Sequence, residues 1–513
     1  MKDTFYITTP IYYVNDVPHI GHAYTTIACD VLARWHRMKG KRVYFLTGTD
    51  EHGEKVQKSA TQKGLSPRQL ADQVVTNFQG LSPALTISNT GFIRTTEPRH
   101  YASVQDLFRR SLANGDIYLG EYEGWYCVPD EAYWTERQLA DAGGNCPTCG
   151  RPVEKRKEPS YFFRLSRYQD RLLRYYGENP GFIRPEERRN EVVAFVAGGL
   201  NDLSVSRTSL SWGIPVPDAP GHVIYVWYDA LTNYITGLGY PQRTPEFTTF
   251  WPADIHMVGK DILRFHAVYW PAFLMSAGVA PPLGVFAHGW WTVEGQKMSK
   301  SLGNVVDPYD MVQRYGADAF RYFLLREVSF GLDGDFSERE LVRRANSELA
   351  DKLGNLLNRS LGMLGRYFGG AVPSPGAQET PDAALRDSGR EAADAVDAAM
   401  EEVAFHKALS AVIELVTKAN EYVQATEPWA LAKDPANRGR LGTVLYNALE
   451  AARLSALLMS PFTPTASQRM WEALVPGGAP VEGARVDAAG AWGGLAAGAA
   501  LPKSCIVFPK IET

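Results

Sequence analysis

The N-terminal part of the chain follows a strand–turn–helix–strand pattern. A short apolar strand is predicted at 4–8, and Pro10 ends it. From 22 to 38 apolar side chains recur every three or four residues, as on one face of a helix, and Gly40 is a suitable stop. A second apolar strand is predicted at 43–47. Such a βαβ unit implies a parallel sheet that binds ligands at the carboxyl ends of its strands.

The turn before this helix reads His-Ile-Gly-His at positions 19–22. A helix N-terminus offers unpaired backbone N–H groups and a partial positive charge, which favour phosphate. Gly21 lets a flat ring approach the backbone closely, and His19 and His22 can donate hydrogen bonds to phosphate oxygens. Taken alone, the motif is better explained as two incidental histidines at a helix start.

A second motif, Lys-Met-Ser-Lys-Ser at 297–301, predicts a basic loop between two ordered elements. An apolar, strand-like run at 283–291 precedes it, and a helix is predicted to start in 305–315. Lysine brings a point charge with three donors, which suits polyphosphate. The alternative is a solvated, lysine-rich turn. The presence of both motifs in one chain favours a phosphate site.

Composition limits the class of protein. The chain has 513 residues, enough for two to four domains, with 45% hydrophobic and 21% charged residues. It has no apolar signal run and no stretch long enough to span a bilayer, so we expect a cytoplasmic protein without membrane contact. Five cysteines suit a reducing compartment. With a net charge of -4, a nucleic acid would have to meet local basic surfaces.

The two motifs together resemble the signature pair of class I aminoacyl-tRNA synthetases. The stretches at 9–15, 47–53, 225–230 and 259–266 are similar to the methionyl-tRNA synthetase family. The resemblance extends from the first strand to about Pro464. It implies an α/β fold in which a Rossmann-type parallel sheet is split by a connective insertion and followed by an α-helical bundle that binds the anticodon.

Five segments are expected on this basis: a first Rossmann half at 1–115, the insertion at 116–223, a second half with the basic loop at 224–337, the helical anticodon-binding domain at 338–475, and a tail at 476–513. The second half is predicted to contain buried strands at 223–227 and 254–258. The tail is Gly- and Ala-rich and then contains a short apolar strand around 506–508. No room is left for an appended dimerisation domain, so a monomer is expected.

The resemblance implies two reaction steps without a protein nucleophile. Methionine attacks the α-phosphorus of ATP and releases pyrophosphate, and the terminal adenosine of tRNA(Met) then takes methionine from the adenylate. His19, His22, Lys297 and Lys300 would stabilise the charge on the phosphates, with Mg²⁺ bound to them. The other residues expected at ATP are Gly21, Gly259, Asp261, Met298 and Ser299.

The amino-acid pocket implied by the resemblance combines one carboxylate with an apolar wall. Asp50 would pair with the α-ammonium group. Aromatic edges would pack against the thioether sulfur. The expected pocket residues are Ile11, Tyr13, Asp50, Trp227, Ala230, Tyr234, Ile262 and His266. Arg207, within the insertion, is implied to return toward the active site, although an exposed loop arginine explains it nearly as well.

The insertion contains a pattern typical of a zinc knuckle. Cys127 and Asp130 are followed by Cys146 and Cys149, with Gly150 next, and this spacing suits a four-ligand site. Three thiolates and one carboxylate can complete a tetrahedron, so Zn²⁺ is predicted. Because Asp is an uncommon ligand in structural zinc sites, an eroded site is the alternative.

The C-terminal part is predicted to be helical throughout, with amphipathic helices at 341–361, 408–423 and 441–458 and a loop at 373–381. In the enzymes that the chain resembles, four positions here face the tRNA anticodon: Asn355, Arg359, Asn420 and Trp429. An exposed Trp can stack an unpaired base. A tryptophan in the core of the bundle is the alternative.

Two other functions stay open from the sequence. One is a class I synthetase for another amino acid, such as cysteine or isoleucine. The insertion is too short to be the large editing domain of the Val, Ile and Leu enzymes. The other is a catalytically silent RNA-binding paralogue, against which the intact motif residues argue.

Overall fold

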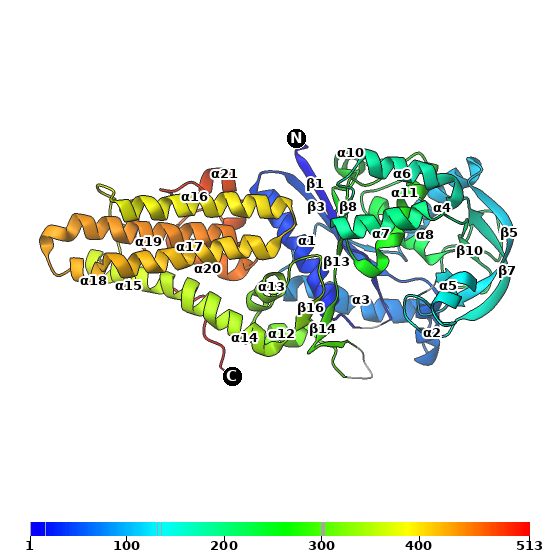
Figure 1. The fold of residues 1–513 in the computed structure, drawn as a ribbon, viewed down its shortest axis with the longest axis horizontal. Coiled ribbons are helices and arrows are strands. Elements are labelled where there is room, and N and C mark those ends of the chain that lie inside the picture. The colour runs from blue at the N-terminus through cyan, green and yellow to red at the C-terminus, as the bar shows by residue number, and fades with distance from the viewer. Residues whose placement is uncertain (1, 16, 131, 135, 299–302, 513) are drawn as a thin grey trace.

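A computed structural model describes residues 2–15, 17–130, 132–134, 136–298 and 303–512. The molecule is elongated (Figure 1). A sheet with its covering helices forms one end, and a bundle of long helices forms the other. Among the described residues, no helix has the length and apolar character needed to cross a membrane.

The central sheet is parallel, with strand order β2-β3-β1-β12-β13-β8 and β4 paired to β3. The first strand of the chain lies inside the sheet, because β1 pairs with β3 on one side and with β12 on the other. Its strands are β1 (Thr4–Thr8), β2 (Tyr12–Tyr13), β3 (Arg42–Asp50), β4 (Gly91–Arg94), β8 (Ile183–Arg184), β12 (Ile255–Gly259) and β13 (Val285–His288). The helices of this half include α1 (Ile20–Met38), α3 (Pro67–Ala84), α4 (Pro98–Ala113), α8 (Val226–Leu231), α11 (Trp270–Ser276), α12 (Pro308–Tyr315) and α13 (Ala317–Arg326).

The segment predicted as an insertion builds its own antiparallel sheet with strand order β6-β5-β7-β9. Its strands are β5 (Ile117–Cys127), β6 (Ala132–Trp134), β7 (Glu154–Phe163) and β9 (Leu203–Ser204), with helices α6 (Gln169–Glu178) and α7 (Glu186–Ala197). The short strand β8 of this segment joins the edge of the central sheet beside β13. The insertion is therefore tied to one edge of the central sheet.

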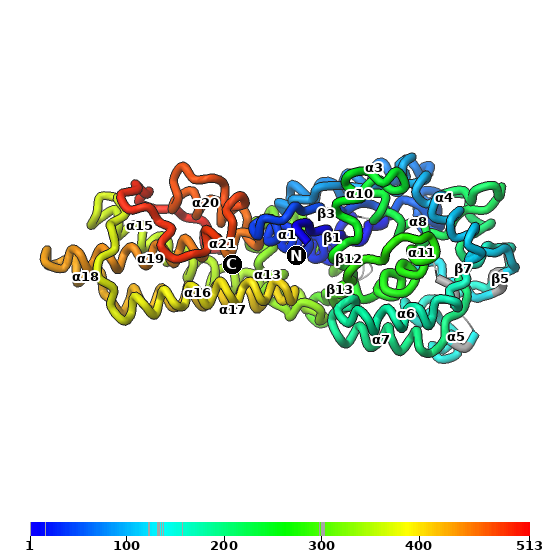
Figure 2. Tube along the Cα trace, turned by 90° about the horizontal axis from the view of Figure 1, so that it is seen from above, coloured from blue at the N-terminus to red at the C-terminus, as the bar shows by residue number. Residues whose placement is uncertain are grey.

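The C-terminal half is the predicted helical bundle. Its long helices are α14 (Glu338–Arg344), a π-helical stretch (Ala345–Gly354), α15 (Asn355–Phe368), α16 (Thr380–Glu401), α17 (Phe405–Thr426), α19 (Arg438–Met459) and α20 (Pro464–Leu474), and α18 (Pro428–Leu431) is one short turn. The tail lies along the bundle (Figure 2). The Glu450 carboxylate on α19 accepts hydrogen bonds from the backbone N–H groups of Gly493, Gly494 and Leu495.

One predicted strand was too long, and another was wrong. The run at 223–227 leaves the extended conformation after Ile224, and α8 starts at Val226. A short buried helix is apolar all round, so periodicity does not separate it from a buried strand. Residues 503–512 contain no strand, and Ile506 is 62% exposed. An apolar run without a neighbouring strand has no ladder to join.

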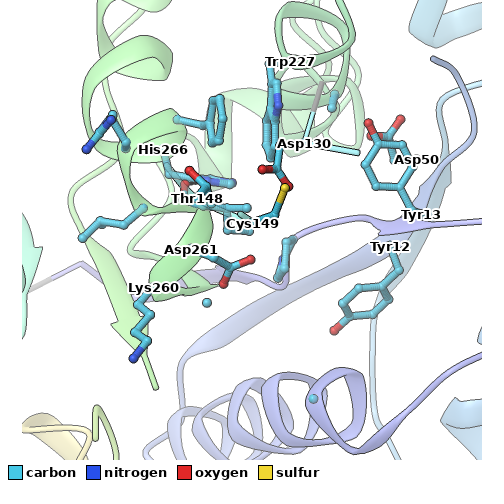
Figure 3. A pocket seen from close by; sticks show the side chains of 18 of the residues that line it. Tyr12, Tyr13, Asp50, Asp130, Thr148, Cys149, Trp227, Lys260, Asp261 and His266 are labelled. Atoms are coloured by element: carbon cyan, nitrogen blue, oxygen red, sulfur yellow. Dashed lines mark hydrogen bonds between the residues drawn. The ribbon is translucent and has the colours of Figure 1, made fainter. Parts of the chain in front are cut away.

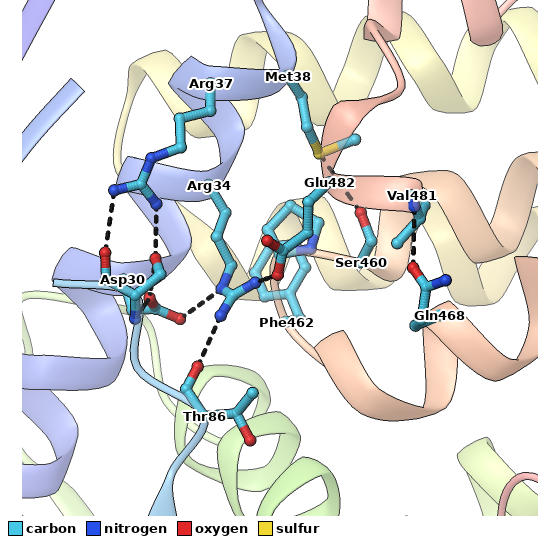
Figure 4. A network of polar contacts seen from close by, with 12 residues as sticks. Asp30, Arg34, Arg37, Met38, Thr86, Ser460, Phe462, Gln468, Val481 and Glu482 are labelled. Carbon is cyan, nitrogen blue, oxygen red and sulfur yellow. Dashed lines mark hydrogen bonds and ion pairs between the residues drawn. The ribbon is translucent and has the colours of Figure 1, made fainter. Parts of the chain in front are cut away.

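A buried ion network joins the catalytic half to the bundle. The Asp30 carboxylate on α1 accepts from Arg34 at 2.8 Å and from Arg321 on α13 at 2.7 Å. Arg321 also donates to the carbonyls of Pro461 and Phe462, between α19 and α20. Figure 4 shows Arg34 reaching Thr86 on one side and Glu482 of the tail on the other.

Candidate active site

A cavity of about 1030 Å³ opens at the carboxyl ends of β1, β3, β12 and β13. The order of the strands reverses between β1 and β12, and parallel sheets bind ligands at such a point. The lining includes these residues of the predicted ATP and amino-acid sites: Ile11, Tyr13, His19, Gly21, His22, Asp50, Trp227, Ala230, Tyr234, Gly259, Asp261, Ile262, His266 and Met298. The structure thus brings together residues from three separate parts of the sequence.

The two histidines of the first motif close the N-terminus of α1. His19 is the N-cap, and its Nδ1 accepts from the Gly21 backbone N–H at 3.1 Å. His22 Nδ1 accepts from the His19 backbone N–H at 3.0 Å. Burial, with His19 close by, holds the pKa of His22 well below its ordinary value. Because Nδ1 accepts a hydrogen bond in both rings, the ring proton of each lies on Nε2.

An aromatic cluster forms one wall of the cavity. The Trp227 indole stacks on Phe265, with centroids 3.7 Å apart and planes at 5°. His266 Nδ1 donates to the Ile262 carbonyl at 3.0 Å, because a carbonyl only accepts. Its Nε2 is then the acceptor for the Tyr234 hydroxyl at 2.6 Å. Burial lowers the pKa of His266 to about 4, so this wall is uncharged at neutral pH.

Asp50 stands opposite this wall, as Figure 3 shows, at the end of β3 and with 4% of its surface exposed. Tyr13 pairs with Asp50 in the ladder between β2 and β3. A buried carboxylate at a cavity wall is suited to a cationic group of a ligand.

The basic loop is described only in part. Lys297 lies in β15 (Gln296–Lys297), which pairs with β14 (Trp291–Val293), and Met298 lines the cavity. Ser299 and Lys300 lie outside the described residues. Of the residues that flank this gap, Met298 and Val305 both line the cavity.

The four predicted metal ligands lie together at the tip of the insertion. Atoms from Cys127, Asp130, Cys146 and Cys149 are all within 4.8 Å of one another. Asp130 Oδ2 is 2.9 Å from Cys146 Sγ, and the Sγ atoms of Cys127 and Cys149 are 3.6 Å apart. Asp130 and Cys149 also line the cavity, near Trp227 in Figure 3. The donor set and its spacing fit a tetrahedral ion such as Zn²⁺.

The four residues predicted at the anticodon lie on the bundle, on α15, α17 and α18. The Arg359 guanidinium is 5.9 Å from the centre of the Trp429 ring, and Trp429 is half-buried. The Asn420 side chain donates to the backbone carbonyls of Lys352 and Val416, whereas Asn355 is exposed. Figure 1 places α18 at the end of the molecule far from the sheet.

Several cavity residues were not predicted. Trp290 follows β13, and its Nε1 donates to Asp261 at 3.0 Å. Lys260 lies 4.3 Å above the same indole and is paired with Asp333 at 2.7 Å. Because ligands bind at the carboxyl ends of parallel strands, His288 at the end of β13 and Trp290 just after it could also have been expected here. Arg207 lines the cavity, as the resemblance implied, with its guanidinium 4.5 Å from the Tyr225 ring centre.

Known proteins match this chain over its whole length. A family model described as tRNA synthetases class I (M) matches residues 5–361, and one described as the anticodon binding domain of methionyl tRNA ligase matches residues 372–513. The chain belongs to the methionyl-tRNA synthetase family. The family thus accounts for both halves of the molecule, the sheet with its cavity and the helical bundle.

Relatives and solved structures agree with this family. The methionine–tRNA ligase of Caldanaerobacter subterraneus is 54% identical over 92% of this chain and 74% of its own length. That of Brucella suis is 51% identical over 99% of this chain and 98% of its own. A structure of the Mycobacterium tuberculosis methionyl-tRNA synthetase with methionyl-adenylate is 48% identical, with a TM-score of 0.95 over 99% of this chain and 100% of that one.

Proposed function

We propose that this methionine–tRNA ligase binds L-methionine and ATP in the one cavity at the carboxyl ends of its strands. The observation that carries the proposal is the shared lining: the predicted ATP residues and the predicted amino-acid residues face the same space. A buried carboxylate, an uncharged aromatic wall and a helix N-terminus surround this cavity. Methionine offers a matching ammonium group and thioether, and ATP offers the phosphates.

In the first step, the methionine carboxylate attacks the α-phosphorus and pyrophosphate leaves. Negative charge on the leaving phosphates would meet the Nε2–H groups of His19 and His22 and the ammonium groups of Lys297 and Lys300. Mg²⁺ bound to the phosphates would supply further positive charge. In the second step, a hydroxyl of the terminal adenosine of tRNA(Met) attacks the carbonyl carbon and AMP leaves.

The amino-acid side of the cavity would select methionine by shape and by one charge. Asp50 would hold the ammonium group, while Trp227 and Ile262 would enclose the thioether. Tyr13 and Ile11 would complete the wall, and Ala230 would leave room for the side chain. Amino-acid-dependent ATP–pyrophosphate exchange tests this: we expect exchange with methionine, whereas stronger exchange with cysteine or isoleucine would contradict the proposal.

We propose Gly21, Gly259, Asp261, Met298 and Ser299 as the remaining ATP contacts. Gly259 is the last residue of β12 and Asp261 stands two residues later, where the Trp290 indole donates a hydrogen bond to its carboxylate. A carboxylate there can accept hydrogen bonds from the ribose hydroxyls. The expected division of the chain, 1–115, 116–223, 224–337, 338–475 and 476–513, and a cytoplasmic, monomeric enzyme stay predictions.

We propose that Cys127, Asp130, Cys146 and Cys149 bind a zinc ion at the tip of the insertion, beside the cavity. We expect metal analysis of the purified protein to give about one zinc per chain. Replacing Asp130 with alanine should weaken zinc retention against a chelator, because three thiolates leave one coordination position without a protein ligand. Glu136→Ala, on the neighbouring helix α5 (Glu136–Asp141), is the matched control. Absence of stoichiometric zinc in the unaltered protein would contradict the proposal.

Trp429, Arg359, Asn355 and Asn420 are proposed to contact the anticodon of tRNA(Met). Trp429→Ala should weaken tRNA binding by about 1–3 kcal/mol, the range for stacking of one base, and should leave ATP–pyrophosphate exchange intact. Aminoacylation at limiting tRNA measures the effect. Tyr367→Ala is the control, since Tyr367 is a half-buried aromatic residue on α15 beside Arg366. Equal loss of exchange and charging in the Trp429 variant would indicate a folding defect and contradict a role in tRNA binding.

A further inference from the structure

A buried carboxylate with two histidines lies behind the amino-acid side of the cavity. Asp229 on α8 accepts from His52 Nδ1 and from His100 Nε2, each at 2.7 Å. The three side chains are 0%, 1% and 0% exposed for Asp229, His52 and His100. The outer ring nitrogens contact hydroxyls, His52 with Tyr101 at 3.0 Å and His100 with Thr236 at 3.1 Å. None of the three side chains is part of the cavity lining.

The cluster joins two elements that carry cavity residues. His52 stands two residues after Asp50, in the loop that follows β3. Asp229 stands between Trp227 and Ala230, on α8. The two elements belong to opposite halves of the split sheet. The hydrogen bond between His52 and Asp229 is therefore a direct link between the proposed ammonium site and the proposed thioether pocket.

Glu51, between Asp50 and His52, is held by a different set of partners. Glu51 accepts from Arg94 Nε at 2.7 Å and from Arg94 Nη2 at 3.0 Å. Thr49 and Thr96 also donate to its carboxylate. These partners lie on β3, on β4 and just after β4, in the same half as the loop itself. Glu51 fixes the loop to its own half of the molecule, whereas the side chain of His52 bonds to α8.

Asp229 is ionised in this setting. Burial alone would raise the pKa of its carboxyl group, but His52 and His100 outweigh that effect and the pKa lies below its ordinary value. A buried carboxylate with both oxygens occupied by imidazole donors has one favoured position, because turning either ring away would leave a buried charge with fewer partners.

We propose that Asp229 is a positioning residue that, through His52, sets the distance between Asp50 and the pocket around Trp227. The inference rests on the proposed role of Asp50 at the methionine ammonium group. An enzyme that must hold one end of methionine by charge and the other by shape needs these two contacts at a fixed separation, and small displacements are costly in rate. The link would thus contribute to preference for the length of the methionine side chain.

The test is a double-mutant cycle in the full-length protein, read by methionine-dependent exchange. Asp229→Ala should raise KM for methionine about tenfold, the effect of about 1.4 kcal/mol, with KM for ATP unchanged. Asp50→Asn should raise the same KM at least as much. If Asp229 acts through Asp50, the double variant should resemble Asp50→Asn alone, because coupled sites are not additive.

Three further variants make the result specific. His52→Phe keeps the ring but breaks the link from the loop side, so it should reproduce the Asp229→Ala shift, and it carries the test if Asp229→Ala does not fold. Asp229→Asn should recover most of the affinity, because the amide can accept from one imidazole and donate to the other. Thr232→Val is the control, since the Thr232 hydroxyl on the same buried segment donates to the nearby Tyr228 carbonyl at 2.8 Å.

The outcomes separate the inference from the function on which it rests. An unchanged KM for methionine in Asp50→Asn would overturn the proposed role of Asp50 and the inference with it. If Asp50→Asn raises that KM but His52→Phe and Asp229→Ala do not, only the inference is overturned. Additive effects in the double variant, or equal shifts in KM for methionine and for ATP, would show a general structural role and would also overturn it.

Discussion

Lys300→Ala is expected to slow methionine-dependent ATP–pyrophosphate exchange by about 10²–10³-fold, the usual effect of removing one donor that stabilises transition-state charge. The proposed role of Lys300 is to meet charge as it develops on the phosphates, so the loss should fall on the rate. Binding of methionine should survive, because Asp50 and the aromatic wall lie on other elements. Exchange kinetics and equilibrium methionine binding measure the two effects separately.

Lys407→Ala is the matched control for this variant. Lys407 lies on α17, is 60% exposed and pairs with Glu402 at 3.0 Å. Its loss should leave exchange unchanged. Exchange at the unaltered rate in Lys300→Ala would show that the second motif is not part of the phosphate site, and the assignment of both motifs to one ATP site would fail.

Arg321→Leu is expected to lower the free energy of unfolding by about 3–5 kcal/mol, the range for breaking a buried ion pair from one side. Arg321 is 0% exposed and donates to Asp30 and to three backbone carbonyls, those of Leu85, Pro461 and Phe462. Leucine would leave these carbonyls without that donor and Asp30 with less compensating charge. Arg321, with Arg34, outweighs burial and holds the pKa of Asp30 below its ordinary value.

Denaturant unfolding measures this effect, with Arg485→Leu as the control. Arg485 pairs with Asp487 at 2.8 Å, and both side chains are more than half exposed, at 54% and 61%. A surface pair of this kind contributes at most about 1 kcal/mol. Equal changes in the two variants would show that the Asp30 network does not hold the catalytic half to the bundle.

Much of this architecture could be predicted because its signals are local. The βαβ unit is visible in the spacing of apolar residues. Gly259 and Asp261, which the resemblance marked, also agree with the rule that ligands bind at the carboxyl ends of parallel strands. The same rule, applied to the strand at β13, would have found Trp290. The long helices of the bundle follow from their periodic leucines, and the structure has one continuous helical path from α14 to α15 through the π-helical stretch.

The parts that could not be predicted depend on distant contacts. Asp229 and His52 are 177 positions apart, and nothing in either local sequence marks them as a pair. The same holds for Asp30 and Arg321, which are 291 positions apart. The strand predicted at 223–227 ends early, at Ile224, for a related reason. Tertiary packing rather than local preference decides whether a short buried run becomes a strand or a helix.

Isolation of the enzyme-bound intermediate tests the central claim most directly. The protein is mixed with methionine labelled in its carboxyl group, ATP and Mg²⁺, together with pyrophosphatase, and is then separated from the small molecules. We predict that methionyl adenylate stays with the protein and passes to tRNA(Met) when the tRNA is added without further ATP. Recovery of no protein-bound adenylate, or of an adenylate that tRNA(Met) does not discharge, would contradict the account.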